Sequence, residues 1–495
     1  ASVQAAGGML SSKVEVRTVD GDRRLFARAA LAPGEVLMRI PAACHIAGEW
    51  PGMCADEARE AALLKPDQQQ TFLLLVRLLR ESARSGATSS PSAAYYRTLP
   101  SFVDVPLAWP AEDLWGLAEH HRALFGLSRR RAWLATVQAA VRRCRGLERT
   151  GWDDLLWAIA IVDSRSFGLG EGERRRLRLV PLADLANHHP ALGARMDYSL
   201  EEEGFTMRCE GAYGAGEEIH VTYGVNSNDK LLEKYGFSLP VNEEHNGYCP
   251  DEVAFLLPLP RDNSAFKLRL LKTSGLCTGT GVVQICVTYI RRVPELFSVL
   301  RLVVADEEDV AMILAKCPGI EDVFKIRSLS LKNETQAWCL LWRYSCGRCT
   351  GFQAPSDQRL LSRGFARTVD AVQTCMLSGG GALCGQGESG GRGRLAEPVI
   401  VTITRDALRE CGGTPEPRPQ DDERVRSLAS ECATPGLPEV MPRDRAAADA
   451  SQMARRAAEH AALVRHVVAS DRRVFAHFAA LAALSLAVVS LPDAE

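Results

Sequence analysis

The spacing of hydrophobic residues changes several times along the chain, and each change predicts a different kind of secondary structure. Near the start, apolar and polar residues alternate, as at Val14 and Val16, which indicates short strands. The turn sequence Ala32-Pro33-Gly34-Glu35 precedes the apolar run Val36–Ile40, which we expect to be another strand. Strand character returns between Leu177 and Tyr223, where glycines punctuate the pattern.

Between about residues 56 and 160 the spacing is helical instead. Two sets of apolar residues each share one helical face: Phe72, Leu75, Val76 and Leu79, and then Trp152, Leu155, Leu156, Ile159 and Val162. Thr150 and Asp153 are spaced like a capping box, with Asp in place of the usual Glu, and predict the start of the second helix. A helical segment therefore interrupts the strands.

After Pro250 the pattern is mostly helical. Pro294 suits the first position of a helix that carries Leu296, Val299, Leu300 and Val303 on one face, and Asn333-Glu334 opens another helix. The stretch from about Thr273 to Cys286 has no clear periodicity. Residues 378–396, rich in glycine, and residues 411–443, rich in Pro, Asp and Glu, predict disordered loops.

Near the C-terminus, the apolar run Val474–Leu491 is a weak transmembrane candidate. As a helix it would span about 27 Å, slightly less than the hydrocarbon core of a bilayer. It is also rich in alanine and continues a helical pattern that begins near Asp444. A packed terminal helix is the better interpretation, and we expect no membrane partner.

Composition narrows the class of protein. A chain of 495 residues predicts two or three domains, and 46% hydrophobic with 24% charged residues is typical of a globular protein. A net charge of −2 does not favour nucleic-acid binding. The 15 scattered cysteines indicate buried thiols in a reducing compartment, and Cys346 and Cys349 lack a second ligand pair for zinc. No signal peptide is visible at the start, although a removed transit peptide would leave no trace.

Three short motifs carry the candidate chemistry. Asp184 and Asn187-His188 are followed about 35 residues later by Tyr223-Gly224, and then by Tyr235-Gly236-Phe237. Taken singly they are unremarkable, since Asp and Asn favour turns and caps. Adjacent histidines on a strand point to opposite sides, and no further ligand lies at metal spacing, so we predict no metal.

In this order and spacing, the motifs resemble those of the SET-domain methyltransferases, in the class of the Rubisco large-subunit lysine methyltransferase and the actin-histidine methyltransferase. The resemblance is strong from about Lys13 to Asn246 and loose afterwards. It implies an α+β fold. A pseudoknot-type SET β-fold would occupy residues 12–246, split by a helical insertion at about 56–160. An all-α substrate-binding domain would follow at residues 250–495.

The resemblance also implies S-adenosylmethionine as the cofactor and a protein as the substrate. Tyr223 matches the family's catalytic tyrosine, and Tyr235 would face the target amine, with Arg165 also on the substrate side. The residues expected to hold the cofactor are Glu35, Val36, Leu37, Ser164, Arg165, Asp184, Asn187, His188, Tyr223 and Phe237. Arg165 would act as a donor fork for a carboxylate, although an arginine that closes an apolar helix also suits the helix dipole.

These residue types suit methyl transfer from a sulfonium, which is an in-line displacement by a neutral nucleophile. A lysine has a pKa near 10.4 in water, so the pocket must desolvate it before it can attack. The Tyr223 hydroxyl would help to aim the methyl group through weak C–H···O contacts. Tyr235 favours lysine over histidine, because the histidine-directed relative carries a smaller residue there.

One departure from the family pattern keeps alternatives open. The family usually has Gly-x-Gly before Leu-Phe-Ala, where this chain has Asp22-Arg23-Arg24 after Gly21. Either the turn has shifted by one residue or cofactor affinity is weakened. We therefore weigh a lysine methyltransferase against a histidine methyltransferase and a catalytically weak SET scaffold. We expect a monomer that binds a protein such as the Rubisco large subunit through its C-terminal domain. The expected compartment is the chloroplast, with cytoplasm or nucleus as alternatives.

Overall fold

A computed structural model describes residues 2–83, 91–114, 117, 121–170, 176–259, 264–274, 276, 282–288, 290–316, 328–350, 352–353, 414–415 and 450–489. The chain divides into two compact units. Unit 1 comprises Ala1–Ala118, Ala123–Pro250 and Glu423–His466, and unit 2 comprises Glu119–Arg122, Asp251–Asp422 and Val467–Glu495. The predicted disordered loops lie outside the described residues, apart from Thr414–Pro415.

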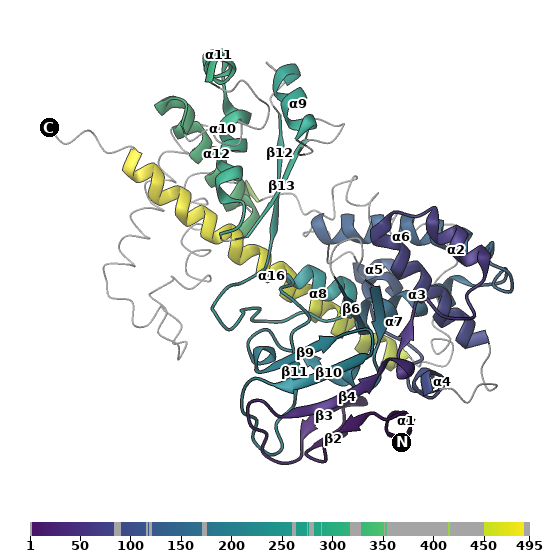
Figure 1. The fold of residues 1–495 in the computed structure, drawn as a ribbon. Coiled ribbons are helices and arrows are strands. Elements are labelled where there is room, and N and C mark those ends of the chain that lie inside the picture. The colour runs from purple at the N-terminus through teal and green to yellow at the C-terminus, as the bar shows by residue number, and fades with distance from the viewer. Residues whose placement is uncertain are drawn as a thin grey trace. The chain divides into compact units, whose positions relative to one another are not determined.

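The centre of unit 1 is a four-stranded antiparallel sheet. Its order is β1 (Met9–Leu10), β4 (Val36–Pro41), β10 (Gly204–Cys209) and β9 (Met196–Leu200). Its central neighbours, β4 and β10, are separated in sequence by the whole helical segment (Figure 1). The strand pattern of a β-fold split by an insertion is therefore confirmed.

Smaller sheets complete this part of unit 1. β2 (Val14–Val19) and β3 (Asp22–Ala27) form a hairpin, and β5 (Ile46–Ala47), β7 (Arg176–Leu179) and β6 (Ser166–Leu169) form a three-stranded sheet. The parallel pair β8 (Asn187–His188) and β11 (His220–Val221) joins two of the sequence motifs. Short helical segments are α1 (Ser2–Ala5), η1 (Ala42–Cys44), η2 (Pro106–Ala108), η5 (Ala183–Leu185) and η6 (Leu192–Arg195).

The β2–β3 turn is the place where Gly21 and Asp22-Arg23-Arg24 stand instead of the family's Gly-x-Gly. Asp20 and Gly21 have φ values of 53° and 89°, and β2 and β3 pair Val19 with Asp22. Positive φ at both central residues is the requirement of a type I′ hairpin turn. Gly21 thus forms the turn itself, while Arg24 lies inside β3 opposite Arg17.

The helices of unit 1 are α2 (Ala55–Ala62), α3 (Pro66–Ala83), α4 (Pro91–Tyr96), α5 (Ala111–Leu114), α6 (His121–Arg142), α7 (Trp152–Arg165) and α8 (Asn228–Tyr235). Both predicted apolar faces, on α3 and α7, are buried. The predicted cap of α7 was wrong by one residue. The Gly151 N–H donates to the Asp154 carboxylate at 3.3 Å, while the Thr150 hydroxyl donates to the Leu147 carbonyl. Because the helix begins at Trp152, its third residue is Asp154 and not Asp153.

Unit 2 contains α9 (Ser264–Thr273), α10 (Val293–Val304), α11 (Glu307–Lys316), α12 (Leu331–Thr350) and the strand pair β14 (Phe352–Gln353) and β15 (Thr414–Pro415). The predicted helices at Pro294 and Asn333 are confirmed as α10 and α12. Unit 2 is not entirely helical, however, because β12 (Val253–Pro258) and β13 (Val282–Val287) form an antiparallel pair. β13 falls in the stretch that lacked a clear period, and its alternate residues are buried.

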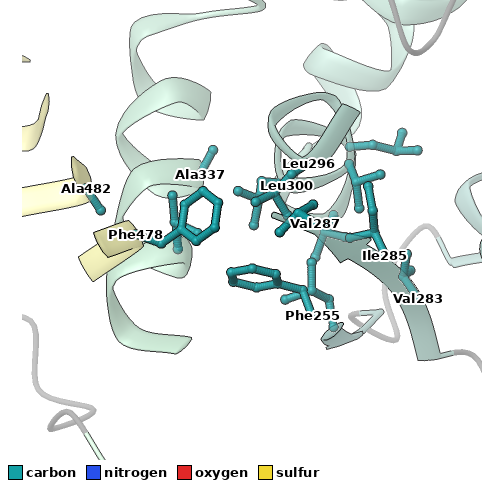
Figure 2. Packing of buried hydrophobic residues seen from close by; sticks show 14 of the residues in the cluster. Phe255, Val283, Ile285, Val287, Leu296, Leu300, Ala337, Phe478 and Ala482 are labelled. Atoms are coloured by element: carbon teal, nitrogen blue, oxygen red, sulfur yellow. The ribbon is translucent and has the colours of Figure 1, made fainter. Parts of the chain in front are cut away.

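The core of unit 2 gathers side chains from the β12–β13 pair and from α9, α10, α11, α12 and the C-terminal helix α16 (Ala450–Val489). Figure 2 shows Phe255 of β12 beside Phe478 of α16, and their ring centroids are 5.5 Å apart. Leu296 and Leu300 of α10 join the same cluster. The apolar run that begins at Val474 is thus core-forming in its described part, as predicted for a packed helix. Among the described residues, no helix is long and apolar enough to cross a membrane.

Candidate active site

Four aromatic side chains from the sequence motifs form one cluster in unit 1. The ring centroids of Tyr223 and Tyr235 are 4.7 Å apart, and those of His188 and Tyr223 are 5.2 Å apart. Phe237 lies 6.0 Å from Tyr235 and 6.1 Å from His188. The parallel β8–β11 pairing sets His188 opposite Val221, which explains how motifs distant in sequence meet.

Tyr223 is held at both ends of the residue. Its hydroxyl donates to the Ala186 carbonyl at 3.0 Å, and its backbone N–H donates to Nδ1 of His188 at 3.1 Å. Burial lowers the pKa of His188 to about 4, so the ring is neutral at pH 7 and its proton is on Nε2. Burial raises the pKa of Tyr223 well above its ordinary value, so the phenol stays protonated. The cluster therefore carries no formal charge.

Arg165 and Asp184 form a buried ion pair beside this cluster. Nη1 of Arg165, the last residue of α7, donates to Oδ2 of Asp184 at 2.9 Å. The Asp184 side chain is only 3% exposed, and burial raises its pKa, while Arg165 and the Tyr95 hydroxyl lower it. Nε of Arg165 and Oδ1 of Asp184 are both buried without a hydrogen-bond partner. The pair thus retains a donor on Arg165 and an acceptor on Asp184.

The backbone just before Asp184 is strained. Leu182 has a φ of 67°, one of three non-glycine residues with positive φ among the described residues. Side chains with a Cβ pay about 1–2 kcal/mol for this conformation, and such strain often marks functional sites. Leu182 leads directly into η5, the 3-10 turn that presents the Asp184 carboxylate to Arg165.

Asn187 is connected to the residue that departs from the family pattern. Its side-chain N–H donates to Oε1 of Glu218 at 2.7 Å, and Arg24 lies 3.5 Å from the other oxygen of the same carboxylate. At this position the family usually has glycine, whereas Arg24 brings a positive charge. That charge is paired with Glu218, the residue that also binds Asn187.

The remaining predicted site residues have other partners. The Glu35 carboxylate binds Lys13 at 2.8 Å and the Ala32 N–H at 3.1 Å, and this Lys13 contact lowers its pKa. Val36 begins β4, and Leu37 is buried in the core against which Tyr223 packs. The Ser164 hydroxyl donates to the Ala160 carbonyl within α7. Their predicted contacts with a cofactor stay predictions.

Sequence reasoning missed Glu218, which accepts a hydrogen bond from Asn187, and the buried Tyr95, which influences the pKa of Asp184. No local pattern marks them, because their partners come from distant segments, with Glu218 lying 31 residues from Asn187. The second histidine of the His-His pair has a turn role, since Nδ1 of His189 accepts the N–H groups of Ala191 and Leu192. Among the described residues, no group of three His, Cys, Asp or Glu could hold a metal ion.

Comparison with known proteins finds no matching family model. Over 106 residues the chain is 37% identical to the chloroplastic [fructose-bisphosphate aldolase]-lysine N-methyltransferase of Arabidopsis thaliana, covering 19% of this chain and 21% of that protein. Over 289 residues it is 27% identical to the actin-histidine N-methyltransferase of Danio rerio, covering 54% of this chain and 46% of that protein. The chain thus matches less than half the length of these relatives.

A solved structure of Rubisco LSMT bound to sinefungin and monomethyllysine is similar with a TM-score of 0.55 and 19% identity, covering 87% of this chain and 90% of that one. The LSMT SET domain bound to lysine and AdoHcy gives a TM-score of 0.54 at 18% identity, covering 87% and 89%. This chain has the fold of the SET-domain protein methyltransferases and is similar in sequence to lysine- and histidine-directed protein methyltransferases, as its motifs predicted.

Proposed function

We propose that this chain is an S-adenosylmethionine-dependent protein N-methyltransferase that modifies a lysine side chain. The observation that carries the proposal is the uncharged cluster of His188, Tyr223, Tyr235 and Phe237. Ring faces attract an incoming ammonium group, and an apolar surrounding then favours its loss of a proton. A neutral amine is the nucleophile that the displacement requires.

The hydrogen bond of Tyr223 suits a role in aiming the methyl group. Because its proton is directed to the Ala186 carbonyl, the oxygen lone pairs remain to accept weak C–H···O contacts. The polarised C–H bonds of a sulfonium methyl are suitable donors for them. Tyr223 would therefore act as the catalytic residue without changing its protonation state, in keeping with its raised pKa.

The residues around the cluster fit the proposed cofactor. The donor that remains on Arg165 matches a carboxylate, and S-adenosylmethionine carries one at its amino-acid end. Asp184 would position Arg165 for this role, and Asn187 would add a polar contact held by Glu218. Titration with S-adenosylhomocysteine tests this step. Lack of binding at high micromolar concentration would favour the catalytically weak scaffold instead.

Lysine is favoured over histidine by Tyr235, the residue that we expect to face the target amine, although the relatives include enzymes named for both. The test is to incubate the purified chain with a labelled methyl donor and a cell extract, and then to hydrolyse the labelled protein. Methyllysine is the expected product. Methylhistidine would overturn the lysine assignment while keeping the methyl-transfer proposal.

The nature of the protein partner is a further part of the proposal. We infer a substrate such as the Rubisco large subunit, bound by a monomer through the C-terminal unit, in the chloroplast. Similarity to an Arabidopsis enzyme named chloroplastic supports this compartment, and similarity to actin-directed enzymes supports the cytoplasmic or nuclear alternatives. The labelled protein recovered from the extract decides among them.

A further inference from the structure

One segment of unit 1 borders the candidate site. It begins at α4 with the buried Tyr95, whose hydroxyl lowers the pKa of Asp184. Further along, the backbone carbonyl of Asp104 packs against Gly236, between the ring residues Tyr235 and Phe237. A Cβ added to Gly236 would lie 1.9 Å from that carbonyl oxygen. The position of Asp104 therefore limits where the two rings can stand.

Asp104 is itself fixed by a histidine from the C-terminal helix α16. Nε2 of His460 lies 3.0 Å from Oδ2 of Asp104, and Nδ1 lies 2.7 Å from Oδ2 of Asp113. With both ring nitrogens facing carboxylates, each nitrogen must donate, so the ring is an imidazolium. It stacks on Trp109 with centroids 3.9 Å apart, and the Trp109 indole also donates to Asp104.

The same helix makes a second contact next to the rings. The Ser238 hydroxyl, one residue after Phe237, donates to the Leu463 carbonyl at 2.8 Å and lies 3.4 Å from Nδ1 of His466. This part of α16 belongs to unit 1, like the rings themselves. Two turns of α16 thus reach the Tyr235–Ser238 stretch, one directly and one through Asp104.

We propose that His460 is a positioning residue for the aromatic pocket and acts on Tyr235 and Phe237 through the contact between Asp104 and Gly236. The effect of His460 on catalysis rests on the proposed function. Its effect on the position of the rings rests only on the His460 clamp, by which we mean the contacts of His460 with Asp104 and Asp113. The imidazolium holds two carboxylates that would otherwise repel each other, and it is only 6% exposed. Without the imidazolium, Asp104 can move away from Gly236, and the rings of Tyr235 and Phe237 lose that support.

The effect on the position of the rings is tested by hydrogen–deuterium exchange on the full chain. In His460→Ala, amide exchange should rise in residues 232–239 and 98–105, whereas Glu459→Ala should leave both peptides as in the wild type. Glu459 is a matched control, because it is the neighbouring residue and its exposed pair with Arg455 lies on the same helix. His45→Ala removes another buried histidine of unit 1 and controls for general loosening. Unchanged exchange of residues 232–239 in His460→Ala overturns the inference.

The effect on catalysis is tested by kinetics on the same variants. We expect His460→Ala to lower kcat by about tenfold or more, as a displaced pocket does, while its affinity for S-adenosylhomocysteine stays within about twofold of the wild type. In the double variant His460→Ala/Tyr235→Phe, the fold-loss of kcat should be smaller than the product of the two single fold-losses, because both substitutions act on Tyr235. The positioning role is contradicted if His460→Ala keeps full kcat. It is also contradicted if the fold-loss of kcat in the double variant equals the product of the two single fold-losses. If the wild type transfers no methyl group, the proposed function is wrong. Hydrogen–deuterium exchange then remains the test of whether His460 positions Asp104 and the rings.

Discussion

The Tyr223 hydroxyl makes one hydrogen bond, to the Ala186 carbonyl, and the Tyr223 ring packs against His188 and Tyr235. The hydroxyl can therefore be removed with little other change. We predict that Tyr223→Phe lowers methyl transfer by roughly 100-fold, because the methyl group loses the oxygen that aims it. Only one hydrogen bond, to the Ala186 carbonyl, is lost, which should cost about 1 kcal/mol of stability. Affinity for S-adenosylhomocysteine, measured by calorimetry, should stay nearly constant. Full activity would show that Tyr223 is only a wall of the cluster.

Asp184 gives a second prediction at the residue scale. Asp184→Asn keeps the shape of the side chain but leaves Arg165 without its anion, which should lower the free energy of unfolding by about 3–5 kcal/mol. Glu217→Gln is the matched control, because it breaks a more exposed pair with Arg195 that contributes at most about 1 kcal/mol. Urea titration of both variants makes the comparison. Equal effects would mean that the Arg165–Asp184 pair adds little to stability.

At the scale of elements, sequence periodicity predicted α3, α7 and α10 well, because each buries one apolar face. The helix predicted to open at Asn333 is α12, which begins two residues earlier at Leu331. Periodicity failed at β13, where Val282-Val283-Gln284-Ile285-Cys286-Val287 is almost continuously apolar and gives no alternation to read. It also set the cap of α7 one residue early, because Thr150 and Gly151 are both acceptable caps, and the Thr150 hydroxyl donates to the Leu147 carbonyl instead.

The end of α8 shows how strongly one element can depend on one glycine. Gly236 ends the helix at a φ of 76° and faces the Asp104 carbonyl, whereas Gly216 has a φ of 89° with nothing within 4 Å. Gly216→Ala should cost about 1–2 kcal/mol from its backbone conformation alone. Gly236→Ala should cost more, because Asp104 must also move. We expect this difference in the free energy of unfolding, and a larger loss of methyl transfer only for Gly236→Ala.

At the scale of the whole molecule, the candidate site was only partly predictable from sequence. The ring residues and Arg165 stand within recognisable motifs, and the structure brings the rings together. Tyr95, Glu218 and His460 could not be found that way, because each meets its partner through tertiary folding. His460 in particular lies hundreds of residues beyond the motifs, in a helix whose pattern indicates only packing. Supporting residues of this kind carry no local signature.

Histidines in unit 1 should give its stability two opposite responses to pH. Burial lowers the pKa of His45 and of His188 to about 4, below the unfolded value of about 6.5. The unfolded chain therefore binds these protons first, and stability falls as pH drops from 6.5 towards 4, by about 3 kcal/mol for each histidine. For His460, burial opposes protonation, but Asp104 and Asp113 raise the pKa overall. Its contribution is complete below 6.5 and is lost as pH rises through the folded value.

These responses separate in variants. Acidic side chains also contribute at low pH, and removing His460 takes a partner from Asp104, so the His460 variant is compared with the wild type only above pH 6.5. Urea unfolding of the wild type, His45→Gln and His460→Gln at pH 4.5, 6.5 and 8.5 makes the comparison. His45→Gln should lose less stability than the wild type between pH 6.5 and 4.5, since it no longer holds a neutral histidine in the core. His460→Gln should lose less between pH 6.5 and 8.5, because it has no proton to release from the clamp. Parallel pH profiles for all three chains would mean that neither histidine titrates differently in the folded state.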